Sequence, residues 1–289
     1  MGEVTEYAPG MPNLAELATP DIRVSRAFYR ELLGWRSFTI ADDRLGDYDM
    51  WTLDEPGDPE VGWLKALADD SQRPSWTCYI SVDDMEAALK RVTAAGGQVL
   101  TDPVDVGHLG RMALVGDPEG ADLGLWQAYT FQGAAVVGEP GAMCWAELAC
   151  RDPGRAEEFY ARVFGWTFAR RDYYAASYTN WRVGGRSMGG ILAMDERWSP
   201  NYPAHWIPYF AVTDCDAYAA KAVELGATIR VPPTDIPPGR FTHLADPTGV
   251  RVALIKPAHW ARPDLGESAR TGPLARFRSR RAGPGRDPR

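Results

Sequence analysis

The stretch FYRELLGW, from Phe28 to Trp35, returns as FYARVFGW, from Phe159 to Trp166. Each copy spaces its apolar residues three or four positions apart and then reaches a glycine. This pattern predicts an amphipathic helix that ends at a left-handed turn. The two copies lie nearly half of the 289-residue chain apart. One half of the chain is therefore the candidate unit of repetition.

The match between the halves extends well beyond this helix. Four segments stay in step: AELATPDIRVSRAFYRELLGWRSF from Ala15 with AELACRDPGRAEEFYARVFGWTF from Ala146, YISVDDMEAAL from Tyr79 with YFAVTDCDAYA from Tyr209, AGGQVL from Ala95 with LGATIR from Leu225, and GDPEGADLGLW from Gly116 with ADPTGVRVALI from Ala245. A constant offset over four segments indicates duplication of a whole domain.

Each half also repeats one pattern internally. In the first half a short alternating strand precedes a helix over residues 22–33, which Gly34 ends, and three strand-like runs follow. The pattern restarts with WTCYISV and a helix over residues 83–95, followed by three more strands. The sequence thus predicts an α+β protein of four βαβββ modules.

Composition shifts mark the boundaries of these units. We expect an N-terminal tail over 1–11, a first domain over 12–130, a linker over 131–141 and a second domain over 142–256. Residues 257–289 are rich in Arg, Gly and Pro, so we expect this tail to be disordered.

The bulk composition is that of a soluble globular protein, with 45% hydrophobic and 24% charged residues. The formal net charge of −8 argues against nucleic acid as a partner. No apolar run reaches the length of a membrane span, and the first residues lack the order of a signal peptide. We therefore expect a cytoplasmic protein that does not contact the membrane.

The four cysteines, at positions 78, 144, 150 and 215, form no CxxC pair and lie mostly in apolar runs. Buried free thiols are the expected state.

The repeated FYxxxxGW element and the DPxG hairpin before each last strand resemble the vicinal oxygen chelate superfamily, which includes glyoxalases, bleomycin-resistance proteins and extradiol dioxygenases. The resemblance covers nearly all of residues 11–256, and the tandem actinobacterial proteins labelled hydroxylase-like or glyoxalase-like look most similar. It implies that paired βαβββ modules curl into cups that hold a small molecule. The sequence leaves open whether the modules of one cup come from one half or from both.

Many members of that superfamily hold a divalent metal through His, Glu or Gln on inward-facing strand positions. Carried over by the FY and DPxG anchors, these positions fall on Leu14, Trp145, Thr77, Ile207, Gly124 and Ala253. Allowing a shift of two residues brings in only Glu16 with Asp122, or Glu147 with His205, whereas a catalytic zinc needs three protein ligands. We expect no metal and no other cofactor.

Two glutamates, Glu16 and Glu147, occupy equivalent places inside AEL. By strand alternation each shares a face with a carried metal position and should point into its cup, where apolar walls would raise its pKa and suit it to acid–base catalysis. The alternative is a structural glutamate that pairs with an arginine or caps a backbone group in the core. His243 is the third catalytic candidate, and its counterpart in the first copy is Leu114.

Aromatic residues are abundant, with 11 Trp and 12 Tyr, and such rings often line pockets for flat ligands. The second half holds the richer set, so its cup is the expected working one. The predicted ligand-binding residues are Trp145, Trp181, Trp198, Trp206, Tyr209, His205, Leu14, Tyr79 and Trp126.

These observations favour a metal-independent enzyme of acid–base type, an isomerase, lyase or cyclase, acting on an apolar or aromatic secondary metabolite. The alternatives are a binding protein that sequesters a drug, a metal-dependent glyoxalase or dioxygenase relative, and a duplicated scaffold with one degenerate cup. The negative net charge favours a neutral or cationic ligand. The oligomeric state stays open, and a homodimer is compatible with the sequence.

Overall fold

The computed structural model describes residues 4–41, 47–53, 59–69, 72–173, 176–196 and 198–258. The elements of the first half are β1 (Pro12–Thr19), α1 (Ile22–Leu33), β2 (Trp35–Ile40), β3 (Tyr48–Leu53), β4 (Glu60–Ala66), β5 (Ser75–Ser81), α2 (Met85–Ala94), β6 (Gln98–Val99), β7 (Val104–Val106), β8 (Gly110–Gly116) and β9 (Asp122–Ala128). Those of the second half are β10 (Met143–Cys150), α3 (Pro153–Phe164), β11 (Thr167–Tyr173), β12 (Ala176–Val183), β13 (Arg186–Ala193), β14 (His205–Ala211), α4 (Cys215–Glu224), β15 (Thr228–Ile236), β16 (Gly239–Ala245) and β17 (Arg251–Pro257). The predicted α+β class and the four modules are confirmed.

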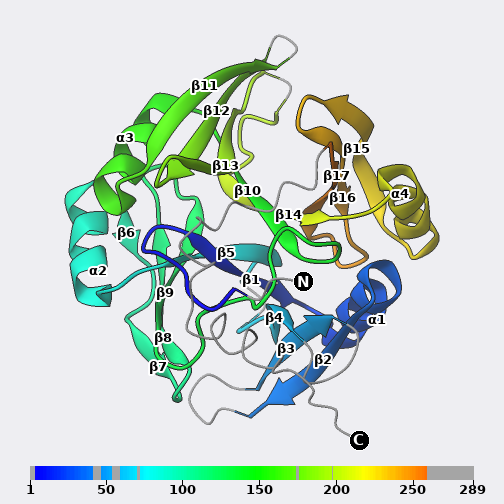
Figure 1. Ribbon diagram of the computed structural model, residues 1–289, viewed down its shortest axis with the longest axis horizontal. Coiled ribbons are helices and arrows are strands. Elements are labelled where there is room, and N and C mark those ends of the chain that lie inside the picture. Colours follow the sequence, from blue (N-terminus) through cyan, green and yellow to red (C-terminus); the bar gives the residue numbers. More distant parts are fainter. Residues whose placement is uncertain are drawn as a thin grey trace, which may run out of the picture.

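Each half forms one curled sheet (Figure 1). The strand order is β2-β3-β4-β1-β5-β9-β8-β6 in the first sheet and β11-β12-β13-β10-β14-β17-β16-β15 in the second. The first strands of two successive modules, β1 with β5 and β10 with β14, pair antiparallel at the centre of each sheet. Each cup is therefore built from the two modules of one half, which settles the pairing that the sequence left open.

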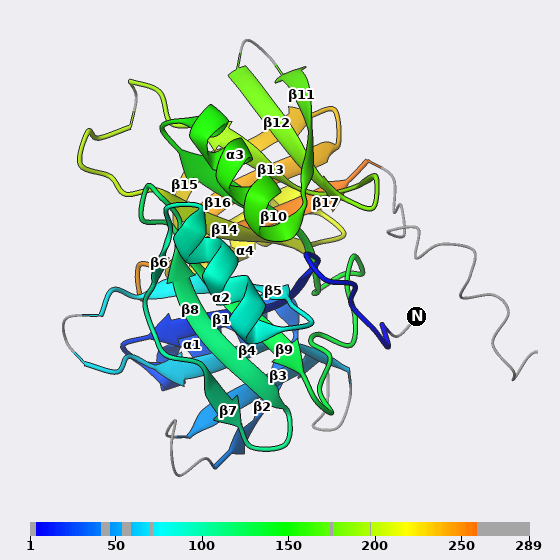
Figure 2. The same ribbon diagram turned by 90° about the vertical axis from the view of Figure 1, so that its left-hand side faces the viewer.

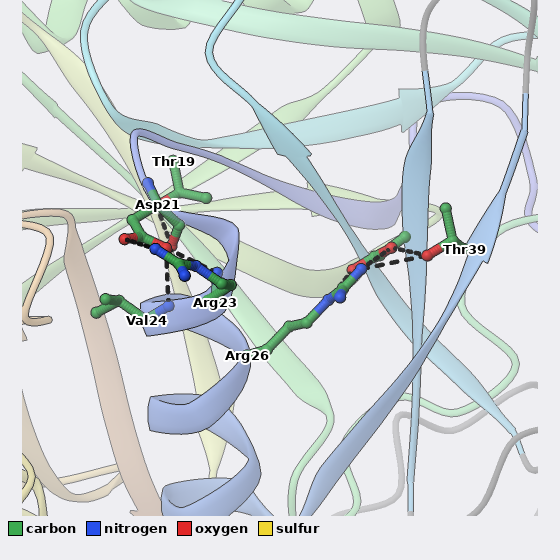
Figure 3. A network of polar contacts seen from close by, with 7 residues as sticks. Thr19, Asp21, Arg23, Val24, Arg26 and Thr39 are labelled. Carbon is green, nitrogen blue, oxygen red and sulfur yellow. Dashed lines mark hydrogen bonds and ion pairs between the residues drawn. The ribbon is translucent and has the colours of Figure 1, made fainter.

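The repeated helices begin and end as their sequences predict. The Asp21 side chain accepts hydrogen bonds from the backbone N–H groups of Arg23 and Val24 at the start of α1 (Figure 3), and Gly34 ends the helix with a φ of 77°. Arg26 then reaches from α1 to the sheet, where it binds the buried Asp49 carboxylate and the Thr39 hydroxyl. The predicted helix over residues 22–33 is confirmed.

The hydrophobic cores join modules from opposite halves. One core combines β5, α2, β8 and β9 with β10, α3, β12 and β13, and the other combines the first module with the fourth. Helix α2 accordingly lies beside α3, and α1 beside α4 (Figures 1 and 2). Each module thus shares a sheet with its chain neighbour and a core with the opposite half.

The repeated motifs bind each other across this interface. The Tyr29 hydroxyl donates to Asp246 of the second DPxG hairpin at 3.1 Å, and the Tyr160 hydroxyl donates to Asp117 of the first hairpin at 3.0 Å. The tryptophans of the two GW pairs also bind across the interface. Trp35 donates its indole N–H to the Gly141 carbonyl, and Trp166 donates to the Gly10 carbonyl. Each of these carbonyls lies just before the first strand of the other half. The chain therefore carries FYxxxxGW twice because each half uses it to hold the other.

Replacing Tyr29 or Tyr160 by Phe is expected to lower the free energy of unfolding by about 1–2 kcal/mol, since each change leaves a carboxylate oxygen of a buried aspartate without its donor. Urea unfolding followed by tryptophan fluorescence measures the change. The shared cores predict a single transition for the whole protein. Tyr129→Phe is the matched control, because its hydroxyl bonds Asp105 at the exposed surface. Separate unfolding of the two halves would contradict this account.

The remaining predictions concern the termini and the thiols. Residues before β1 pack on the segment between the halves, where the Tyr7 hydroxyl donates to the Ala134 carbonyl at 2.6 Å. The predicted disorder of the C-terminal tail falls almost wholly on residues 259–289, outside the described residues. All four cysteines are free, three of them buried and Cys144 half-buried. Among the helices of the described ranges, none is long and apolar enough to cross a membrane.

Candidate active site

The first cup is filled by its own side chains. Three predicted ligand-binding residues, Leu14, Tyr79 and Trp126, face into it but are completely buried. Trp63 packs edge-on against Trp126 and stacks on Phe131. These three predicted ligand residues are therefore part of a packed core.

Glu16 lies in this first cup as an ion-paired residue. Its carboxylate accepts from Lys65 Nζ at 2.7 Å and from the Tyr79 hydroxyl at 3.3 Å, and the side chain is 5% exposed. The structure thus favours the structural interpretation of Glu16 that the sequence left open, with lysine in place of the expected arginine as its partner.

The second cup carries smaller side chains at the matching positions. Glu16 pairs with Trp63 in the first cup, whereas Glu147 pairs with Gly190 in the second. Likewise, Trp126 lies beside Met112 in the first cup, and its counterpart in the second is Ile255, beside Phe241. A Cβ on Gly190 would lie 1.9 Å from the Tyr178 hydroxyl, so the absent side chain makes room for this polar group. The second cup is consequently the more polar of the two.

Glu147 is the central acid of the second cup. The residue is 4% exposed, and its Oε2 accepts from the Tyr178 hydroxyl at 2.8 Å. Its Oε1 accepts no hydrogen bond from any described residue. Burial raises the pKa of this carboxyl to about 7, against a smaller lowering by the hydroxyls of Tyr178 and Tyr209. A carboxyl with a free oxygen and a pKa near neutrality can both take and return a proton.

A tyrosine and a histidine complete this group. The Tyr209 hydroxyl and His243 Nε2 lie 2.7 Å apart, and both residues are buried. Burial, assisted by the positive charge of Arg251, lowers the pKa of His243 to about 3, so its imidazole is neutral. Ala253 pairs with Tyr209 on one neighbouring strand and with His243 on the other. The three side chains therefore point to the same face of the sheet, the face that lines the cup. Carboxyl, phenol and imidazole thus form one polar cluster inside the cup.

The end of the second cup toward the β13–β14 connection carries a different set of groups. Arg251 lies against the rings of Tyr202 and Trp198, at 4.6 and 5.3 Å from their centroids. His205 packs on the same two rings. We call Trp198, Tyr202, His205 and Arg251 the rim cluster.

The model of the Glyoxalase/Bleomycin resistance protein/Dioxygenase superfamily matches residues 12–125 and again residues 126–254. The chain belongs to this superfamily. Its two matches correspond to the two curled sheets.

Two relatives within the superfamily align over most of the chain. CFP32 of Mycobacterium tuberculosis, provisionally named a glyoxylase, is 38% identical over 265 residues that cover 89% of this chain and 99% of the relative. The anthracycline biosynthesis protein DnrV of Streptomyces peucetius is 33% identical over 273 residues, covering 88% of this chain and 95% of DnrV.

A solved structure shares the fold. The 2,2',3-trihydroxybiphenyl 1,2-dioxygenase of Sphingomonas wittichii strain RW1 superposes with a TM-score of 0.61, covering 86% of this chain and 91% of that one at 14% identity. This likeness concerns the fold alone.

The metal that the superfamily resemblance implies does not fit the residues present. The six carried positions hold aliphatic, aromatic, glycine or threonine side chains. Within the part of the chain that the structure describes, no three His, Cys, Asp or Glu residues gather closely enough to hold a metal ion. Of the shifted pairs, Glu16 is engaged by Lys65, and Glu147 with His205 supplies two ligands where a catalytic zinc needs three. No step of the chemistry is therefore assigned to a metal.

Two of the predicted ligand residues, Trp181 and Trp206, lie on the face of the second sheet that points away from the cup. Trp181 stacks on Trp166 with ring centroids 3.9 Å apart, and Trp206 donates to the Tyr160 hydroxyl, so both belong to the core between the halves. The reason is strand alternation: Trp206 adjoins Ile207, which faces the cup, and therefore points the other way. Trp145, Tyr209, Trp198 and His205 do lie in or at the second cup.

Sequence reasoning missed two polar residues of the second cup. Arg251 lies two residues before Ala253 on the same strand face, and alternation from that carried position would have found it. Asn180, which pairs with Gly190, is nine-tenths buried, and its Oδ1 has no partner among the residues that the structure describes. No sequence signal distinguished it.

Proposed function

We propose that the second cup binds a flat apolar or aromatic small molecule and performs acid–base chemistry on it without a metal. The observation that carries this proposal is Glu147 Oε1, a buried carboxylate oxygen without a partner among the described residues, on a group whose pKa is about 7. Perturbed carboxyls of this kind are typical of general bases.

The side chains around Glu147 suit proton transfer at a carbon next to a carbonyl. Glu147 Oε1 takes the proton, the electron pair of the C–H bond moves into the carbonyl, and the Tyr209 hydroxyl donates to the developing oxyanion. For this step the neutral His243 donates its Nε2–H to the Tyr209 oxygen, which leaves the Tyr209 proton for the oxyanion. Return of the proton from Glu147 to another carbon completes an isomerisation. Its transfer to a neighbouring hydroxyl, which then leaves as water, completes an elimination. Its transfer to the alkoxide that forms when the enolate attacks a second carbonyl of the ligand completes a cyclisation. None of these needs an oxidant.

The relatives support an aromatic secondary metabolite as the substrate class. DnrV and its counterpart DauV of Streptomyces sp. (strain C5), at 33% and 32% identity, are named for anthracycline biosynthesis. Anthracyclines are flat polycyclic compounds that carry carbonyl groups, which matches aromatic walls beside a buried base.

A deuterium-exchange assay tests the catalytic part of this proposal. The protein is incubated in heavy water with 1-tetralone and larger aromatic ketones, and mass spectrometry follows deuterium incorporation next to the carbonyl. Catalysed exchange is the expected result. Stoichiometric binding without exchange would contradict an enzyme and favour the alternative, a binding protein that sequesters its ligand. The aromatic walls of the cup satisfy that alternative, but the raised pKa of Glu147 favours catalysis.

Removal of metal is expected to leave exchange and ligand binding unchanged, because the second cup does not present three metal ligands among its described residues. Elemental analysis of the untagged protein, with assays before and after chelator dialysis, measures this. A stoichiometric divalent metal whose removal abolishes exchange, and whose return restores it, would contradict metal independence.

A further inference from the structure

The rim cluster holds a cation, Arg251, that no acidic side chain of the described ranges neutralises. Among the described residues, none forms an ion pair with Arg251, whose contacts are the faces of Tyr202 and Trp198. A guanidinium stacked on rings keeps its in-plane N–H groups for an oxygen ligand. Arg240, on the neighbouring strand β16, is by contrast bound to Asp216 and Asp235.

His205 supplies a second, independent feature beside Arg251. Its Nδ1 lies 2.9 Å from the Pro203 carbonyl oxygen, so Nδ1 carries the proton and Nε2 is left as an acceptor. This Nε2 is buried and has no partner within the described ranges. Burial lowers the pKa of His205, with a contribution from Arg251, which keeps the imidazole neutral and Nε2 ready to accept.

The two features together select one kind of chemical group. An acceptor nitrogen next to a cationic donor fits an acidic hydroxyl, whose O–H donates to Nε2 while its oxygen accepts from the guanidinium. A carboxylate would meet the lone pair of Nε2, and an ether could not donate. The flanking rings of Trp198 and Tyr202 fit an aromatic ring that carries the hydroxyl.

We propose that the rim cluster is a phenol subsite of the second cup. Arg251 and His205 bind a phenolic hydroxyl of a flat aromatic ligand, and Trp198 and Tyr202 contact its ring. The bound hydroxyl oxygen lies between Arg251 and His205, and the negative charge that it gains on ionisation offsets the effect of Arg251 on the imidazole. The phenolic proton therefore moves to His205 Nε2, and Arg251 stabilises the phenolate oxygen. The inference rests on the proposed function, since it specifies the ligand of the same cup.

The inference explains why the two cups differ at this end. In the first cup the register places Asp122 where the second has Arg251, and Ser75 where it has His205. The carboxylate of Asp122 would repel a phenolate, and Ser75 carries no charge to offset that repulsion. The positive charge of Arg251 at this end of the second cup acts on the ligand directly, so it predicts the preferred ligand better than the net charge of −8 of the whole chain.

Two shape-matched probes test the subsite: 2-hydroxyanthraquinone, whose visible spectrum reports ionisation of its phenol, and 2-methoxyanthraquinone, which has no acidic hydroxyl. We expect the wild-type protein to bind the hydroxy probe about 10–100-fold more tightly, from charge-assisted hydrogen bonds, and to show the phenolate spectrum below the pH at which the free probe ionises. Arg251→Met should abolish both the preference and the spectral shift, and should leave the affinity for the methoxy probe within about threefold. His205→Phe keeps a ring beside Trp198 and should abolish the spectral shift.

Arg240→Met is the control, because Arg240 binds Asp216 and Asp235 away from the cup, and it should behave as the wild type. Equal affinity of the wild type for both probes, or a preference that survives Arg251→Met, would overturn the phenol subsite and leave the proposed function standing. Failure of the wild type to bind either probe would overturn both.

Discussion

Proton exchange catalysed by the wild-type protein is expected to fall by about 10²–10⁴-fold when Glu147 is replaced by Gln. The amide keeps the shape of the side chain and the acceptor for the Tyr178 hydroxyl, but it cannot take a proton from the substrate. Ligand affinity should change little, because the aromatic walls are untouched. In the wild type the rate should rise with pH through the Glu147 pKa of about 7, since the carboxylate is the active form. Exchange rates from pH 5 to pH 9 measure both effects.

The matched control for this variant is Glu16→Gln in the first cup. Glu16 occupies the equivalent place in its half but is engaged by Lys65, so its replacement should leave the exchange rate and its pH dependence unchanged. Equal losses in the two variants would show that the exchange does not depend on the chemistry of the second cup. A Glu147→Gln variant with full activity would remove Glu147 as the base.

The fold could be predicted from the sequence because its signals are local or repeated. The helix over residues 22–33 is fixed by the Asp21 cap, its apolar spacing and Gly34, all within a few positions. The cores that join the halves could not be predicted, because the contacts between Tyr29 and Asp246 and between Tyr160 and Asp117 span large distances along the chain. The repeats that revealed the duplication gave no sign that they bind each other.

The candidate site was predictable only where strand alternation applies. Alternation placed Glu147 and Glu16 on cup faces, but their different states follow from neighbours on other strands, Gly190 for one and Lys65 for the other. Trp181 and Trp206 were grouped with the ligand wall by residue type, although their position on the strands sends them into the core. Residue type alone therefore predicts an aromatic-rich interior but not which rings face the ligand.

The duplication also explains how the second cup can hold Glu147, a buried acid with one carboxylate oxygen that no described residue binds. Both halves contribute side chains to the two shared cores. The first cup can therefore be packed with Trp63 and Trp126 while the second keeps smaller and more polar side chains. A buried carboxyl without a full set of partners costs stability, and such groups persist where the rest of the structure holds them. Stability therefore offers a test of Glu147 that does not depend on knowing the substrate.

Glu147→Gln is expected to stabilise the protein above neutral pH, by as much as about 3 kcal/mol. The pKa of Glu147 rises from its ordinary value of 4.5 to about 7 in the folded protein. Between these values the folded state keeps a proton that the unfolded chain releases. The free energy of unfolding therefore falls as pH rises through this window, and the loss persists above it. Glutamine has no charge to bury, so the variant escapes this loss.

Urea unfolding of the wild type and the variant at pH 4 and at pH 8 measures the effect. Other acids whose pKa is raised by burial, such as Asp117 and Asp246, affect the stability of both proteins equally. The difference between the two proteins therefore reports the contribution of Glu147 alone. The difference in the free energy of unfolding between the variant and the wild type should be small at pH 4, because Glu147 is then protonated in the folded protein and largely so in the unfolded chain. It should be large at pH 8. A difference that does not change with pH would mean that Glu147 is an ordinary carboxylate. Loss of exchange together with a gain in stability at pH 8 would identify Glu147 as a base held in the cup for its chemistry, because a structural residue would show the opposite change in stability.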